Sequence, residues 1–258
     1  MDFVKLEVKG GIAIVTLDRQ AKLNALNGMV LNELEETFQE LQGNDEVRVI
    51  IVTGAGEKSF VAGADIGQFP SMSPEDAHAF AKRGQTVFSL IESSTKPVLA
   101  AINGFALGGG CELALSCHLR FASENALFGQ PEVKLGVIAG YGGTQRLPRL
   151  IGRGRALDLL LSGRMIKADE ALQMGLVNGV FPQIELLSKV EEYAEMLMTQ
   201  GPQAQALTIR AVYRGVETTL SKGLEEEAAA FRDVFETEDR IEGATAFLER
   251  RPAKFKNR

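Results

Sequence analysis

Residues 97–113 read PVLAAINGFALGGGCEL, an apolar run followed by glycines and one acidic residue, Glu112. The apolar run predicts a buried strand, and the glycines precede a predicted helix over 108–116. Two other segments follow the same plan of strand, glycine-bearing loop and helix: 47–66 (VRVIIVTGAGEKSFVAGADI) and 128–147 (FGQPEVKLGVIAGYGGTQRL). Strands that alternate with helices favour an α/β fold.

Further predicted strands and helices flank these segments. Strands are predicted at 3–8 and 12–17, joined by a turn at Gly10-Gly11, and at 118–122, 126–128 and 177–181. Helices are predicted at 28–42, 73–92, 152–162, 168–174, 184–199, 203–214, 221–237 and 240–250. Ser73-Pro74 has the form of an N-cap followed by proline at the first helical position. The residues show no fixed-period repeat. Because strands and helices alternate first and helices dominate later, we expect an α/β core with a helical C-terminal part.

Composition narrows the classes of function. The 258 residues carry a net charge of −6, which argues against general nucleic-acid binding. No apolar run is long enough for a membrane span, the N-terminus lacks a signal-like apolar region, and the two cysteines, Cys111 and Cys117, fit a reducing cytoplasm. With only His78 and His118, a multi-histidine zinc site is excluded and no metal is expected.

Two lone acids stand in apolar, turn-rich surroundings. Glu112 follows three glycines and Glu132 follows Pro131. Each acid can be explained as a first-turn residue that the helix dipole favours. A second interpretation is a carboxylate pair for proton transfer, because a buried carboxyl group is costly unless it is stabilised or holds a proton.

The glycine loops leave two interpretations open. Gly54–Ser59 lacks the glycine before lysine that a phosphate loop needs, and neither 108–110 nor 140–143 completes a dinucleotide-binding pattern. Free N–H groups at helix starts can hold a carbonyl oxygen as it gains charge. The alternative is that the glycines only allow tight packing.

The segments 103–115 (NGFALGGGCELAL) and 128–147 together resemble the signature of the crotonase, or enoyl-CoA hydratase, superfamily. Residues 59–66 (SFVAGADI), 21–26 (AKLNAL) and 242–256 (EGATAFLERRPAKFK) are similar to further segments of that family. The resemblance implies a spiral of repeated ββα turns over 1–198, the catalytic core. It also implies a helical oligomerisation region over 199–258, which forms trimers or hexamers.

The resemblance also implies a set of site residues. The amides of Ala64 and Gly109 would form an oxyanion hole for the thioester of an acyl-CoA, and Glu112 and Glu132 would be the catalytic acids. Gly140 would lie near the catalytic water. The remaining implied contacts to the CoA substrate are Lys22, Ala25, Ala62, Asp65, Ile66, Phe247 and Arg250, the last two in some members from a neighbouring subunit. No cofactor is implied, because coenzyme A is part of the substrate.

The implied activity is hydration of a trans-2-enoyl-CoA to a 3-hydroxyacyl-CoA, with fatty-acid β-oxidation as the expected pathway. One alternative is a double-bond isomerase, which usually needs a single acid. An alternative of another class is RNA binding by the basic tail, Arg250, Arg251, Lys254, Lys256 and Arg258.

Tyr141 stands where many hydratases have a small residue, and either fills space or narrows the acyl end of the pocket. The arginines at 146, 149, 153 and 155 are interpreted as helix caps or subunit contacts.

Overall fold

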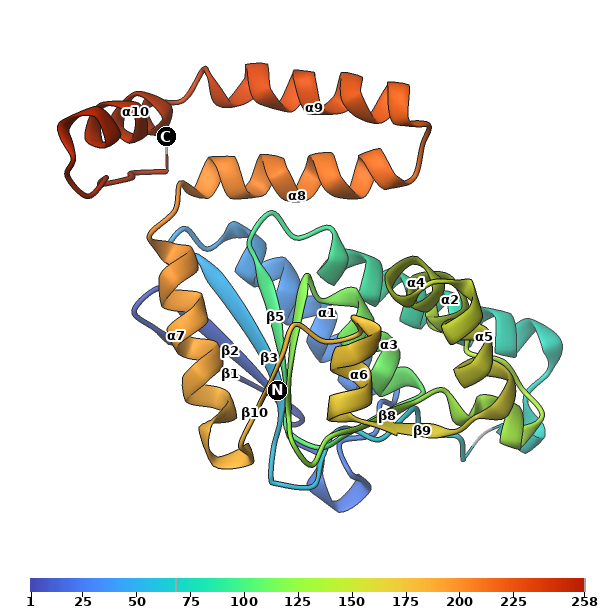
Figure 1. Ribbon diagram of the computed structural model, residues 1–258. Helices are drawn as coiled ribbons and strands as arrows, with labels where there is room; N and C mark the ends of the chain where they lie inside the picture. The colour runs from blue at the N-terminus through green and yellow to red at the C-terminus, as the bar shows by residue number, and fades with distance from the viewer. Residues whose placement is uncertain (68, 258) are drawn as a thin grey trace.

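The computed structural model describes residues 1–67 and 69–257, and its strands form two sheets (Figure 1). The larger sheet has the strand order β1 (Val4–Lys9), β2 (Ile12–Leu17), β3 (Val49–Gly54), β5 (Val98–Ile102), β7 (Leu119–Ser123) and β10 (Gly179–Phe181). The smaller sheet has the order β4 (Ser59–Val61), β6 (Phe105–Leu107), β8 (Leu127–Gly129) and β9 (Met165–Lys167). Among the strands of the described residues, β1–β2 and β8–β9 pair antiparallel, and every other pair is parallel.

Helices connect and cover these sheets. The α-helices are α1 (Gly28–Gly43), α2 (Pro74–Glu92), α3 (Gly109–Ser116), α4 (Gly143–Ile151), α5 (Arg153–Ser162), α6 (Ala168–Met174), α7 (Leu186–Met198), α8 (Pro202–Val216), α9 (Leu220–Val234) and α10 (Glu238–Glu249). Short 3₁₀ helices are η1 (Gln20–Lys22), η2 (Phe69–Ser71), η3 (Pro131–Leu135) and η4 (Gln183–Glu185). Ser73 caps α2 in a reciprocal capping box with Asp76, so the predicted helix start is confirmed.

The chain winds as a spiral in which each turn adds one strand to each sheet and then a helix. The turns are β3–β4–α2, β5–β6–α3 and β7–β8–η3, which confirms the expected ββα repeat. Strands β4, β6 and β9, of three residues each, were not predicted, although the equally short β8 and β10 were. The shared plan of the three segments was partly wrong: in 47–66 the glycine-bearing loop is followed by strand β4 and not by a helix.

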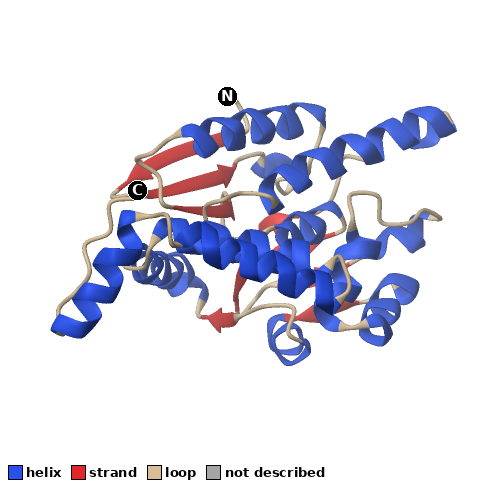
Figure 2. Cartoon of the chain, turned by 90° about the horizontal axis from the view of Figure 1, so that it is seen from above, coloured by secondary structure: helices blue, strands red, loops and turns tan. Residues whose placement is uncertain are grey.

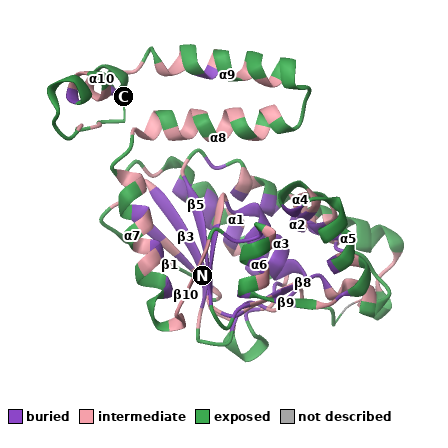
Figure 3. Cartoon of the chain, viewed as in Figure 1, coloured by how far each residue is buried: buried purple, intermediate pink, exposed green. Residues whose placement is uncertain are grey.

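Alternating side chains along the larger sheet create two apolar layers. On β5, Val98, Ala100 and Ile102 face the main core, whereas Leu99 and Ala101 face a second cluster. Helices α1, α2 and α3 contribute to the main core, and α7 covers the opposite face through Leu186, Val190 and Ala194. Figure 3 shows the strands buried between these helices. Burial on both faces explains why residues 49–52 of β3 and all of β5 are apolar in sequence.

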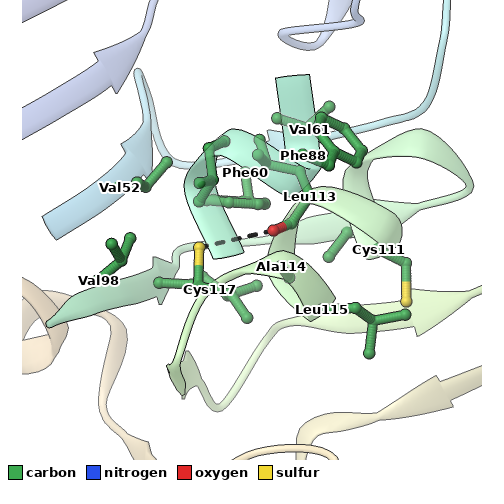
Figure 4. Close-up of a cluster of buried hydrophobic side chains, with 14 of the residues drawn as sticks. Val52, Phe60, Val61, Phe88, Val98, Cys111, Leu113, Ala114, Leu115 and Cys117 are labelled. Carbon is green, nitrogen blue, oxygen red and sulfur yellow. Dashed lines mark hydrogen bonds between the residues drawn. The ribbon is translucent and has the colours of Figure 1, made fainter. Parts of the chain in front are cut away.

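Helix α3 is buried along its whole length. Its Leu113 and Ala114 pack among Val52, Phe60 and Phe88 of neighbouring elements (Figure 4). A Cβ at Gly110 would overlap the backbone of Val61, so only glycine lets the start of α3 lie directly on β4. This close approach fixes where the first turn of α3 points.

The C-terminal helices lie outside the two-sheet body. Helices α8 and α9 run side by side, and α10 follows at the end of the pair (Figures 1 and 2). Of these three helices, α8 has no fully buried residue in this chain. No helix in the described ranges has the length and apolar character needed to cross a bilayer.

Candidate active site

A cavity of about 990 Å³ lies where α2, the start of α3 and the loops at 62–66 and 131–146 meet. Its wall includes both predicted acids, Glu112 and Glu132, and the residues of both predicted amides, Ala64 and Gly109. These residues come from separate turns of the spiral. The structure therefore brings together the four residues that the resemblance implied as catalytic.

Glu112 lies in the first turn of α3 and is 2 % exposed. Its Oε1 atom accepts two hydrogen bonds, from the amides of Tyr141 (2.8 Å) and Gly143 (2.7 Å). Burial raises the pKa of Glu112 to about 7, and the neighbouring carboxylate of Glu132 also raises it, whereas the two amides and Arg146 lower it. A carboxyl group with this pKa can take or give a proton near neutral pH.

Glu132 follows Pro131 in η3 and is partly buried, and burial raises the pKa of its carboxyl group. Gln130, which is fully buried, lies beside it: with the amide nitrogen turned toward Glu132, Nε2 is 3.0 and 3.1 Å from the two carboxyl oxygens. Gly108 has a φ of +50°, and a Cβ there would lie 2.8 Å from Glu132 Oε1. A side chain at 108 would thus be strained and would crowd the acid.

The amides of Ala64 and Gly109 lie close together. A methyl group built on Gly109 would be 3.5 Å from Ala64 N. The backbone N–H of Leu26 donates to Gly63 O, and the backbone carbonyl of Leu26 accepts from Asp65 N. These two hydrogen bonds leave out the N–H of Ala64, which lies between Gly63 and Asp65. Gly109 is the first residue of α3, where an N–H has no partner within the helix. Both donors are therefore suited to an oxygen of a bound ligand.

Tyr141 forms one wall of the cavity and is 2 % exposed. Its ring packs on Phe80 (centroids 5.0 Å apart) and Phe88 (5.6 Å). A Cβ at Gly84 would overlap three of its ring atoms, so the ring sits directly on the backbone of α2. A methyl group on Gly109 would lie 3.4 Å from Tyr141 Cδ2, which places the ring beside the Gly109 amide.

The predicted CoA contacts fall into two sets. Ala62, Ile66 and Gly140 line the cavity. Lys22, Ala25 and Asp65 lie outside its wall; the turn that carries the first two is joined to 62–65 by hydrogen bonds such as Ala62 N to Leu23 O. Asp65 pairs with Arg19 at 3.0 Å, and this pairing lowers the pKa of its carboxyl group.

Phe247 lies on α10 and Arg250 follows it, and neither lines the cavity of its own chain. Phe247 is 83 % exposed. In the basic tail, Arg251 pairs with Glu242 and Glu249, and Arg258 lies outside the described residues. A contribution of Phe247 or Arg250 to a site thus requires a neighbouring subunit.

Several residues of the site were missed in the sequence. Arg146 was interpreted only as a helix cap or subunit contact, whereas the structure shows that it lines the cavity and pairs with Glu92 at 2.8 Å. Gln85 and Gln130 were not singled out. The signals were weak, because Glu92 and Arg146 are 54 residues apart and nothing local links them. His118 lies outside the cavity wall, and its ring bonds to Val98 N and Glu92 O.

The family model described as "Enoyl-CoA hydratase/isomerase" matches residues 7–258. The chain is 48 % identical to a short-chain-enoyl-CoA hydratase of Clostridium acetobutylicum, over 99 % of this chain and 98 % of that one. It is 47 % identical to a crotonyl-CoA hydratase of Syntrophomonas wolfei, over 97 % and 96 %. A solved structure of enoyl-CoA hydratase from Bacillus anthracis superposes with a TM-score of 0.95 at 40 % identity, over 99 % and 100 %.

Proposed function

The chain belongs to the enoyl-CoA hydratase/isomerase family, and from this membership and the site we infer that it is an enoyl-CoA hydratase, a hydro-lyase acting on a trans-2-enoyl-CoA. The observation that carries the proposed mechanism is the placement of two carboxyl groups, the buried Glu112 and the partly buried Glu132, on one cavity beside two amides. We propose that the amides of Ala64 and Gly109 form the oxyanion hole.

The proposed step moves charge onto the thioester oxygen. Conjugation links the β carbon to that oxygen, so attack by water at the β carbon builds an enolate. Two preorganised N–H groups stabilise the enolate more than the neutral substrate, which is the condition for a faster reaction. Loss of one such donor typically costs about 3 kcal/mol in the barrier.

The two acids divide the proton transfers. Two amides donate to Glu112 Oε1, which favours its ionised form. Glu112 therefore accepts the proton of the attacking water through its remaining oxygen, and Glu132 delivers a proton to the α carbon. Because the carboxylate of Glu132 raises the pKa of Glu112, the protonation of Glu112 depends on the charge of its partner.

Activity assays of two variants test this division. Glu112→Gln and Glu132→Gln should each reduce hydration of crotonyl-CoA by more than about 100-fold, because each removes one proton transfer. Loss of the enoyl-thioester absorbance is the measurement. Near wild-type hydration by either variant would refute the two-acid mechanism, and turnover of 3-enoyl-CoA alone by the wild type would assign an isomerase instead.

We further propose a preference for short acyl chains. The Tyr141 ring is fixed between Gly84 and Gly109, so it occupies space beside the reacting carbons. The relatives named for short-chain and crotonyl substrates support this preference. Wild type should hydrate crotonyl-CoA faster than decenoyl-CoA, and Tyr141→Ala should reduce that ratio by about tenfold or more, since one or two methylene groups of contact correspond to such factors. An unchanged ratio would show that Tyr141 only fills space.

The assembly, location and pathway remain proposals. We propose a homo-oligomer, a trimer or a hexamer, in which Phe247 and Arg250 reach the CoA of a neighbour. Support comes from large apolar residues that this chain leaves exposed on α8–α10: Val212, Val216, Leu220, Leu224, Phe231, Phe235, Ile241, Phe247 and Leu248. We also propose that the enzyme acts in the cytoplasm, in fatty-acid oxidation, and without a cofactor beyond the CoA of its substrate.

A further inference from the structure

The loop at 140–143 supports Glu112 and is itself held from behind. Its amides at Tyr141 and Gly143 donate to Glu112 Oε1, so the position of the acid depends on the position of the loop. Two of the loop's carbonyl groups are fixed by side chains: Gln85 Nε2 donates to Gly140 O (2.9 Å), and Arg146 Nη1 donates to Tyr141 O (3.0 Å).

Arg146 is held in place by Glu92 at the end of α2. Its Nε and Nη2 atoms donate to the two carboxyl oxygens of Glu92 at 3.0 and 2.8 Å, a two-point contact that fixes the guanidinium plane. The side chains of this pair are only 13 % and 25 % exposed. The pair therefore connects α2, through α4, to the loop that holds Glu112.

Gly142 makes this connection feasible. Its φ is +117°, and a Cβ at this position would overlap Arg146 Nη1. The arginine folds back over Gly142 to reach the carbonyl group of Tyr141. The glycine thus serves the arginine contact as well as the turn.

We propose that Arg146, clamped by Glu92, is a positioning residue for Glu112: it holds the loop at 140–143 so that both amides face Oε1 and the other oxygen faces the substrate water. This role rests on the proposed hydration chemistry. It differs from a merely structural ion pair because it sets the protonation of the acid as well as its orientation.

The charges around Glu112 give the direction of the effect. Glu132 on η3 raises the pKa of Glu112, and Arg146 on α4 and the two loop amides lower it. Tyr141 and Cys111 also lie close enough to interact with the carboxylate, and both are neutral because burial raises their own pKa values. Removal of Arg146 takes away its charge and loosens the amides, so the pKa of Glu112 rises further.

The experiment compares the pH dependence of kcat for crotonyl-CoA hydration in the wild type, Arg146→Met, Arg146→Lys and Arg83→Met. Arg83 on α2 is the matched control. It also forms an ion pair with a glutamate of another helix, Glu35 of α1 at 2.6 Å, but it lies outside the cavity wall. In Arg146→Met, kcat should fall by about 100-fold, as expected for a misplaced catalytic group. The acid limb of its profile should move up by about half a pH unit or more.

Two further results distinguish positioning from folding. Arg146→Lys, which keeps the charge, should recover part of kcat and most of the limb position, and Arg83→Met should keep the wild-type limb. A loss of activity in Arg146→Met without movement of the limb would overturn the proposal. If Arg146→Met does not fold, Glu92→Gln decides: its limb should move in the same direction, and an unmoved limb would overturn the proposal. Absence of hydration by the wild type would instead refute the proposed function.

Discussion

At the scale of single residues, the buried position of Glu112 lowers the stability of the folded chain when the acid is ionised. The acid is buried in an apolar helix start because α3 lies directly on β4 at Gly110. Two amides compensate part of the cost of burial, but burial still raises its pKa to about 7. The ionised form, which the reaction needs, is therefore unfavourable for the folded state.

The first prediction concerns stability and pH. Because the pKa of Glu112 is about 7 in the folded state and about 4.5 as its ordinary value, the folded chain binds this proton more tightly. Stability from this group is present below pH 4.5 and is lost as pH rises through 7, by up to about 3 kcal/mol. Glu112→Gln, which stays neutral, should gain most of this amount at pH 8 and little at pH 5.

Urea unfolding of the two proteins at both pH values is the measurement. Gln keeps an oxygen for the Tyr141 and Gly143 amides, so the comparison isolates the charge. A gain of equal size at pH 5 and pH 8 would show that burial does not raise the pKa of Glu112.

At the scale of elements, α2 and the loop at 140–143 are in direct contact at Gly84 and Tyr141. Gly84 lies in the middle of α2, where glycine is normally unfavourable, and the ring of Tyr141 lies on its backbone. Helix propensity alone would favour alanine there. The contact with Tyr141 outweighs propensity, because an added methyl group would overlap the ring.

The second prediction compares two helical glycines. Gly84→Ala should destabilise the protein by about 1–3 kcal/mol through overpacking and should lower hydration by displacing Tyr141. Gly154→Ala on α5 is the matched control, since a Cβ there meets nothing within 4 Å, and it should stabilise by about 0.5–1 kcal/mol. Urea unfolding gives both values, and equal effects of the two substitutions would contradict the packing.

The Glu92–Arg146 pair and Gln130 show why contacts between separate helices and loops were not predicted from the sequence. Gly143 N reaches Glu112 from 31 residues away, and Arg146 reaches Glu92 from 54. Gln130 lies in the segment 128–147, whose resemblance to the family was recognised. Its contact with Glu132 was not foreseen, because it depends on the side-chain amide nitrogen facing the carboxyl oxygens of Glu132. Such pairings depend on how successive turns of the spiral stack.

At the scale of the whole molecule, the chain separates a buried two-sheet body from C-terminal helices with exposed apolar side chains. Figure 3 shows this contrast between the purple strands and the mostly green and pink helices α8–α10. The division at residue 198 into a catalytic and an oligomerisation part stays a prediction, although α7 packs on the sheet and α8 has no fully buried residue.

The third prediction tests the exposed C-terminal face. Phe231→Glu and Leu248→Glu place a charge on residues that are 65 % and 81 % exposed in this chain, and each should shift the protein toward smaller species in sedimentation. Ile184→Glu is the control, because Ile184 is 94 % exposed on η4, outside this face. Wild-type assembly of both test variants would show that this face is not the interface.

The sequence by itself determined the strands and helices with strong periodicity, the N-cap of α2, the turns that require glycine, the two acids and the family. The strands, helices, N-cap and turns depend on near neighbours in the chain, so local physics records them, whereas the family was identified from motifs spread along the chain. Only the tertiary structure decided that two amides of a distant loop converge on Glu112, that Arg146 holds that loop, and that Tyr141 stands against Gly109. Those contacts arise where separate turns of the spiral pack together, and no local pattern specifies that packing.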